Sequence, residues 1–177
     1  MPLTPAPASA AALKAILWGG LLAGLGDFFF AHCFYAWKLG VFQNVAGGIM
    51  GREAARAGGM PTYLLGVGLH FLIATIWAAI FWVLSQRLPV LVRNAVPSGL
   101  VDVLVFLVYG LVGLGYGLVV YLGMNCIVVP FSALNTPVKL PPLVSWPAAA
   151  HMALVGLPIA LAAWRFSRST AEHSPTG

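Results

Sequence analysis

Four long apolar runs constrain this chain more than any other feature of its sequence. They cover residues 14–37, 61–84, 97–129 and 146–164. Each run is close to or longer than the roughly 20 residues that a helix needs to cross a hydrocarbon layer of about 30 Å. Only helices and closed barrels satisfy every backbone group inside lipid, and these runs are far too long for barrel strands. The sequence therefore predicts an all-α, polytopic membrane protein built as a four-helix transmembrane bundle.

The composition agrees with a hydrocarbon environment. Only 7% of the 177 residues are charged and 60% are hydrophobic, whereas a typical soluble domain has about 25% charged residues. The formal net charge is +5. However, the Lys and Arg residues stand at the ends of the apolar runs, where they anchor helices at the lipid headgroups. We therefore expect the lipid bilayer to surround this chain, and we expect no nucleic-acid partner.

The third run is longer than one membrane crossing requires. As a single helix its 33 residues would extend about 50 Å, because each residue adds about 1.5 Å. Two spans of about 20 residues and a turn do not fit within it. We expect one helix over residues 97–129, with Asp102 reaching into the headgroups. Four glycines could bend this helix: Gly110, Gly113, Gly115 and Gly117.

The segments outside the spans are polar or rich in proline. Residues 1–12 are rich in Pro, Ala and Ser, and we expect both this segment and the tail at 168–177 to lack regular structure. The membrane domain is then expected at residues 13–167. The link 130–145 contains several prolines and should form an extended cap.

The link between the first and second spans has a pattern of its own. Val41, Phe42, Val45 and Ile49 follow helical spacing, and charged residues follow them. We expect a short amphipathic helix that lies in the membrane interface.

The distribution of basic residues predicts the orientation. With four spans, both termini lie on one side of the membrane. That side holds five Lys or Arg residues, and the other side holds four: Lys14, Arg87, Arg93, Arg165 and Arg168 against Lys38, Arg52, Arg56 and Lys139. Because basic residues are enriched in cytoplasmic loops, we expect both termini in the cytoplasm.

Polar residues inside the spans are the candidates for function. A charged group at the bilayer centre costs at least about 2.5 kcal/mol, so such a group marks a functional site by default. At about 1.5 Å per residue, Asp27 and His70 reach the midplane. By the same count His32, Asn125 and His151 share a level nearer the outer face. The candidate binding cluster is Asp27, His70, Asn125 and His151.

Helical spacing predicts that Asp27 and His70 meet. Gly20 and Gly24 lie on the same face as Asp27, and small residues let two helices approach closely. His70 lies at the same depth, on a face of the second span that also carries small residues. An ionised carboxylate at the midplane needs a partner, so we expect Asp27 within about 6 Å of His70. His32 should face elsewhere.

Two hypotheses account for this cluster. In the first, the polar side chains are structural and stabilise helix packing through hydrogen bonds worth about 0.6 kcal/mol each. In the second, they form a small conduit or transporter for protons or a metal ion, with His70, His151 and His32 as candidate metal ligands. Imidazole suits Zn, Cu, Ni or haem iron without a clear preference, so the cofactor stays undetermined. Small-residue spacings also leave a homo-oligomer or a larger complex open.

The chain lacks the motifs of the common enzyme classes. It contains no HExxH, no P-loop and no GxSxG. Asp27 is the sole carboxylate inside the expected membrane core, so no acid–base pair of carboxylates is available. Cys33 and Cys126 show no metal-type spacing, and we interpret them as small packing residues. We therefore expect no enzymatic activity.

The second half of the chain carries a set of spaced residues. They are Gly113-x3-Gly117, Pro130-x3-Leu134-x2-Pro137, Leu140-Pro141, His151, Arg165 and Arg168, with Leu69-His70-Phe71 earlier. This order resembles the YagU-like bacterial inner-membrane proteins, small polytopic proteins without an established activity. The resemblance implies a four-helix build and a location in the bacterial inner membrane, and it implies no reaction. The function expected from it is a non-enzymatic accessory, scaffold or stress-related component.

Overall fold

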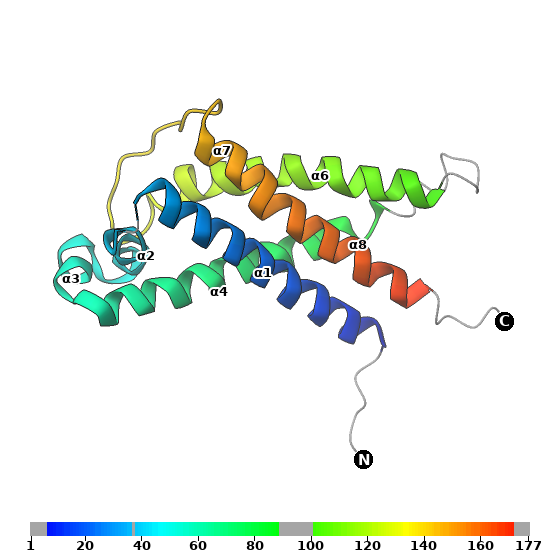
Figure 1. Cartoon of the computed structure of the whole chain (residues 1–177), viewed down its shortest axis with the longest axis horizontal. Helices are drawn as coiled ribbons and strands as arrows, with labels where there is room; N and C mark the ends of the chain where they lie inside the picture. The colour runs from blue at the N-terminus through cyan, green and yellow to red at the C-terminus, as the bar shows by residue number, and fades with distance from the viewer. Residues whose placement is uncertain (1–6, 37, 89–100, 172–177) are drawn as a thin grey trace, which may run out of the picture.

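The computed structural model describes residues 7–36, 38–88 and 101–171, and within these ranges the chain is helical with no strand. Four long helices form an elongated bundle (Figure 1). The start of α1 and the end of α8 lie at one end of it, and the short helices α2 and α3 lie at the other. This arrangement confirms the expected all-α fold.

The long helices agree with the four apolar runs. They are α1 (Pro7–Phe34), α4 (Gly59–Ser85), α6 (Val101–Gly123) and a last helix that consists of α7 (Trp146–Ala150), the π-helical segment η3 (His151–Gly156) and α8 (Leu157–Ala171). A second π-helical segment, η2 (Met124–Val128), extends α6. All four are long and apolar enough to cross a membrane. The chain is therefore a multi-pass membrane protein.

The third run forms one continuous helix over its described residues, as expected, and residues 97–100 lie outside them. Its glycines serve packing more than bending. A Cβ at Gly113 or Gly117 would overlap atoms of the last helix, whereas Gly110 and Gly115 have open space. The helix widens instead at η2, where five residues adopt the π conformation.

Two of the expected segment boundaries are wrong. α1 already begins at Pro7 and α8 continues to Ala171, whereas we expected no regular structure over residues 1–12 and 168–177. At the N-terminal end, the alanines that suggested a segment without regular structure favour the helix, and Ala11 is buried. Residues 1–6 and 172–177 lie outside the described ranges. α1 also ends at Phe34, three residues before the expected Trp37.

The link between the first two spans contains two helices, α2 (Gly40–Met50) and α3 (Arg52–Ala57), separated by Gly51 at a φ of +82°. A positive φ suits glycine because it has no Cβ. The expected helix is present. Phe42 is buried inside the protein, whereas Ile49 is 65% exposed, as an apolar side chain of an interfacial helix that meets lipid would be.

Gln43 takes a place on the buried face of α2. Its side-chain amide donates to the carbonyl of Gly59 at 2.9 Å and to Thr62 Oγ1 at 3.4 Å. Because its hydrogen bonds are satisfied, this polar side chain is buried without the usual desolvation penalty. The four buried residues of α2 are Phe42, Gln43, Ala46 and Gly47.

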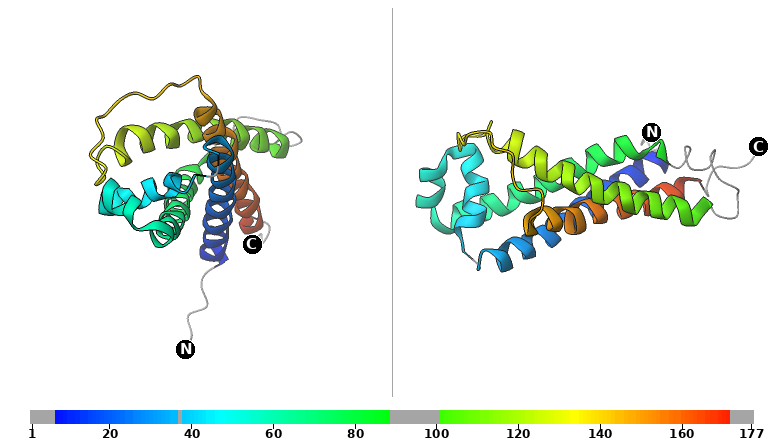
Figure 2. Two further views of the ribbon diagram at one scale, coloured as in Figure 1. Left: turned by 60° about the vertical axis from the view of Figure 1, so that its left-hand side comes forward. Right: turned by 90° about the horizontal axis from the view of Figure 1, so that it is seen from above.

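In the bundle, α1 packs along both α4 and α8, and α6 packs against the last helix (Figure 2). Aromatic side chains bridge α6 and α4. The hydroxyl of Tyr116 donates to the carbonyl of Trp77 at 2.7 Å, and the hydroxyl of Tyr109 donates to the carbonyl of Ser85 at 3.3 Å. With Phe81 they form a buried core toward the end of the bundle where α8 ends. Many large apolar residues are exposed on the outside, as suits a surface that faces lipid.

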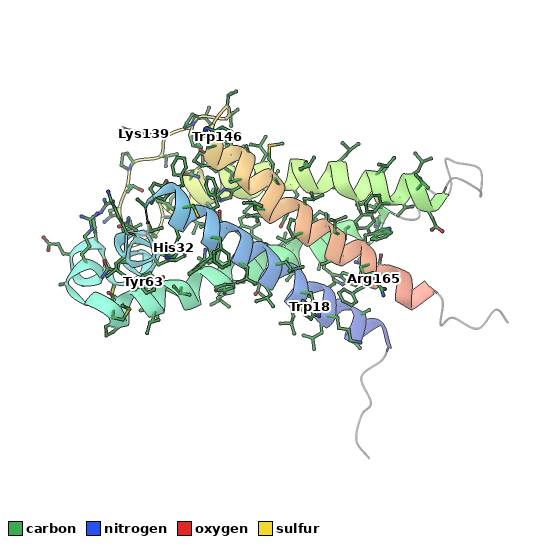
Figure 3. All side chains as sticks on the ribbon, in the orientation of Figure 1. Trp18, His32, Tyr63, Lys139, Trp146 and Arg165 are labelled. Carbon is green, nitrogen blue, oxygen red and sulfur yellow. The ribbon has the colours of Figure 1, made fainter. Side chains whose placement is uncertain are left out.

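Basic residues lie toward both ends of the bundle (Figure 3). Lys139 is near the α2 end, in the extended segment between α6 and α7, and Arg165 is near the opposite end. This segment is extended as expected. Ala133, near its start, donates its backbone N–H to the carbonyl of Gly48 at 2.9 Å, which attaches it to α2.

Candidate functional site

One carboxylate lies between two imidazoles inside the bundle. Asp27 of α1 has Oδ2 at 4.0 Å from Nδ1 of His70 on α4. Its other oxygen, Oδ1, is 3.9 Å from Nδ1 of His151, the first residue of η3. The three side chains are between 15% and 20% exposed. The expected proximity of Asp27 and His70 is confirmed.

His151 reaches a depth that the sequence did not predict. We expected it nearer the outer face than Asp27, but it lies at the same level. The depth of Asp27 was counted from Lys38, whereas α1 already ends at Phe34. Asp27 is therefore closer to the end of its helix than the count assumed.

Small residues place α1 against α4 at this site. A Cβ on Gly20 would meet the backbone of Thr75, and one on Gly24 would meet the ring of Phe71. This close approach lets His70 Nε2 lie 3.0 Å from the carbonyl oxygen of Gly24. Because a carbonyl only accepts, Nε2–H is the donor and Nδ1 is left facing Asp27.

The start of the last helix orients His151. Ser145 caps α7 by accepting the N–H of Ala148 at 3.3 Å, and Pro147 occupies the first turn. His151 Nδ1 donates to the carbonyl of Pro147 at 2.8 Å, so its Nε2 stays available. The helix then widens to a π-helix, a distortion that is frequent at functional sites.

A small cavity of about 60 Å³ lies beside this cluster. The distances from carboxylate to imidazole exceed hydrogen-bond length, and the cavity has room for water that would bridge them. Asp27, His70 and His151 line it together with apolar and aromatic side chains: Ala23, Ile73, Ala74, Trp77, Val120, Met124 and Val155.

A second and larger cavity of about 610 Å³ lies between α2, α4, η2 and the extended segment that follows η2. Ile73 and Met124 line both cavities, so these two side chains form the wall between them. The polar residues that line the larger cavity are Tyr35, Asn44, Arg52, Asn125, Ser132 and Thr136. Sequence reasoning missed this cavity, although Asn44 and Arg52 are polar residues close to the apolar residues of the link.

Two of the expected site residues lie apart from Asp27. Asn125 donates to the carbonyl of Tyr121 at 2.8 Å and lines the larger cavity only. His32 is 3% exposed, with Nδ1 at 2.9 Å from the carbonyl of Phe28 and Nε2 at 2.9 Å from the hydroxyl of Tyr63. His32 and Tyr63 lie close together in Figure 3. As expected, His32 does not face Asp27.

The geometry gives the metal form of the conduit hypothesis no support. Within the described ranges, no three His, Cys, Asp or Glu side chains are arranged to hold a metal ion. Both ring nitrogens of His32, one of the candidate ligands, are already hydrogen-bonded. The two cysteines are free thiols. The interpretation of Cys33 as a packing residue is wrong, because it is exposed on the outside of α1.

The helices and this cluster define a four-span helical membrane protein with a carboxylate–imidazole group inside its bundle. Comparison with protein-family models, curated proteins and solved structures finds no match to this chain. The resemblance to the YagU-like proteins therefore stays a prediction.

Proposed function

We propose that this protein is a non-enzymatic membrane protein that moves protons, and that Asp27 with His70 and His151 is its proton-binding site. The observation that carries the proposal is the position of one carboxylate within 4.0 Å of two imidazoles, beside a cavity inside an apolar bundle. Ionisable groups in membrane spans are costly, and they commonly form proton relays.

The chemistry of the pair suits reversible proton binding. Nδ1 of His70 is the ring nitrogen left free by the hydrogen bond to Gly24. One proton can be shared between this nitrogen and the Asp27 carboxylate, with either the neutral acid or the ion pair as the result. Both states have no net charge, which limits the cost of the site in a low-dielectric bundle. Nε2 of His151, which the bond from Nδ1 to Pro147 leaves free, offers a second acceptor for a transferred proton.

The two cavities suggest where a proton would enter. The larger cavity lies at the α2 end, and only the Ile73–Met124 wall divides it from the cavity beside Asp27. In the other direction, the core of Phe81, Tyr109 and Tyr116 closes the bundle. We infer that protons reach Asp27 from the α2 end in this conformation.

Thiol labelling tests this route. In a background with Cys33→Ser and Cys126→Ser, an Ile73→Cys variant in lipid-depleted detergent should react with a charged methanethiosulfonate. A Phe81→Cys variant should stay protected, because Phe81 is 2% exposed. Equal reactivity at the two positions would show that the larger cavity does not lead to the site.

The second candidate is the structural role, and a specific observation favours it. Each imidazole of the cluster donates a ring N–H to a backbone carbonyl, and the bond from His70 to Gly24 joins α4 to α1. A protein of this kind would serve as an accessory or scaffold. Its Asp27→Asn and His70→Ala variants would lose folding or assembly but no flux.

The direct test is proton flux in proteoliposomes. The purified protein is reconstituted with a pH-sensitive dye inside, and a potassium gradient with valinomycin drives protons inward. Wild-type vesicles should acidify faster than vesicles without protein. Equal rates would reject proton movement and leave the structural role.

We also propose a bacterial inner-membrane location with both termini in the cytoplasm, from the resemblance to the YagU-like proteins and from the distribution of basic residues. The α2 end would then face the periplasm.

A further inference from the structure

The larger cavity has the size and lining of a ligand site. Its volume of about 610 Å³ lies within the range of about 300–1,000 Å³ typical of small-molecule sites. Apolar side chains line it together with the polar residues described above, among them Val45, Leu69, Ile73, Met124 and Val128. A mixed lining of this kind suits an amphipathic molecule with an acyl chain and a polar head.

The charge of the lining selects an anion. Among the described residues that line it, Arg52 is the one with a charge, and none is Asp or Glu. Arg52 is exposed and makes no hydrogen bond or ion pair with any described residue. Arg56, on the same short helix, lines a neighbouring cavity and not this one. Basic pockets of this kind bind acidic lipid headgroups.

Two buried oxygens of the lining lack partners. Asn44 Oδ1 and Thr136 Oγ1 are enclosed, and neither makes a hydrogen bond with a described residue. Such a group has lost its hydrogen bonds to water without a replacement, which is unfavourable. A ligand that satisfies Asn44 Oδ1 must supply a donor, and a hydroxyl on its head would do so. Thr136 can accept from that hydroxyl or donate to an anion.

We propose that this cavity binds an anionic glycerophospholipid whose headgroup carries hydroxyls. Its phosphate binds Arg52, its hydroxyls contact Asn44 and Thr136, and one acyl chain lies along Leu69 and Ile73. Because α4 and η2 belong to helices that cross the membrane, a lipid chain can reach Leu69 and Ile73 from the bilayer. This proposal does not depend on proton movement, since lipid binding is measured directly.

Lipid titration of the delipidated protein, followed by native mass spectrometry, tests the proposal. The probes are phosphatidylglycerol and phosphatidylcholine with identical chains. Phosphatidylglycerol should bind more tightly. Arg52→Gln should weaken its binding about tenfold, which corresponds to about 1.4 kcal/mol. Leu69→Trp, which fills the chain side of the cavity, should weaken it as well.

Arg56→Gln is the matched control, because it removes the same charge from the same short helix but does not line this cavity. It should leave phosphatidylglycerol binding nearly unchanged. If both arginine variants weaken binding equally, the lipid binds to general surface charge and the site is rejected. Equal affinity for the two lipids rejects the anionic head. If free glycerol 3-phosphate displaces the lipid and binds with the same affinity, the cavity is a site for a soluble anion, and the lipid assignment is overturned.

Discussion

An Asp27→Asn variant is expected to show no proton flux above that of protein-free vesicles. Asn has nearly the size of Asp and keeps hydrogen-bonding capacity, but it neither binds nor releases a proton in the working pH range. The imidazoles of His70 and His151 would remain 4 Å or less from the substituted side chain, as they are from the carboxylate. The measurement is the initial rate of dye response in proteoliposomes at a fixed membrane potential.

Asp102→Asn is the matched control for this variant. It also removes one carboxylate, but from the first turn of α6 and away from both cavities. Its flux should equal that of the wild type. A folded Asp27→Asn protein with full flux would contradict the proposed site. If the wild type shows no flux and the Asp27→Asn variant is less thermally stable than the wild type, the structural role is indicated. The melting temperature of each variant in detergent separates these outcomes.

A Gly66→Ala variant is expected to destabilise the packing of α2 on α4. A Cβ at this position would overlap the carbonyl group of Phe42, which is backbone and cannot move aside alone. Overpacking of this kind costs about 1–3 kcal/mol, more than the gain of up to about 1 kcal/mol in helix propensity. We expect a lower melting temperature and faster proteolysis of the α2–α3 link.

Gly68→Ala provides the control on the same helix. A Cβ there meets nothing within 4 Å, so only the gain in helix propensity remains, and stability should be equal or slightly higher. If the two alanine variants melt at the same temperature, α2 is not held against α4 as the structure shows. The comparison requires no knowledge of function.

Helical periodicity within single spans made the Asp27–His70 part of the site predictable. Gly20, Gly24 and Asp27 share a face of one helix, and this spacing alone indicated a close neighbour on that face. The depth of His70 then made it the expected partner, and the two side chains do meet. Depth along a helix is set by residue count, so it can be estimated wherever the end of the helix is known.

The prediction was wrong where a helix end or a face was misjudged. His151 was assigned to another level because the depth of Asp27 was counted from Lys38, whereas α1 ends at Phe34. On α2, the apolar pattern left out Gln43, but the position of Gly66 on α4 selects a buried face that includes it. Periodicity describes one helix, whereas these outcomes depend on the surface of its partner.

The sequence by itself determined that this chain has four membrane-spanning helices, that its third apolar run is a single helix, and that Asp27 points toward His70. These properties depend on hydrophobic length and on the period of the helix, which are local. Only the tertiary structure decided that His151 joins Asp27, that η2 and η3 widen into π-helices, and that a cavity of about 610 Å³ lies beside Arg52. Such features depend on how the side chains of helices from distant parts of the chain pack against one another. The sequence of a single segment does not contain that packing.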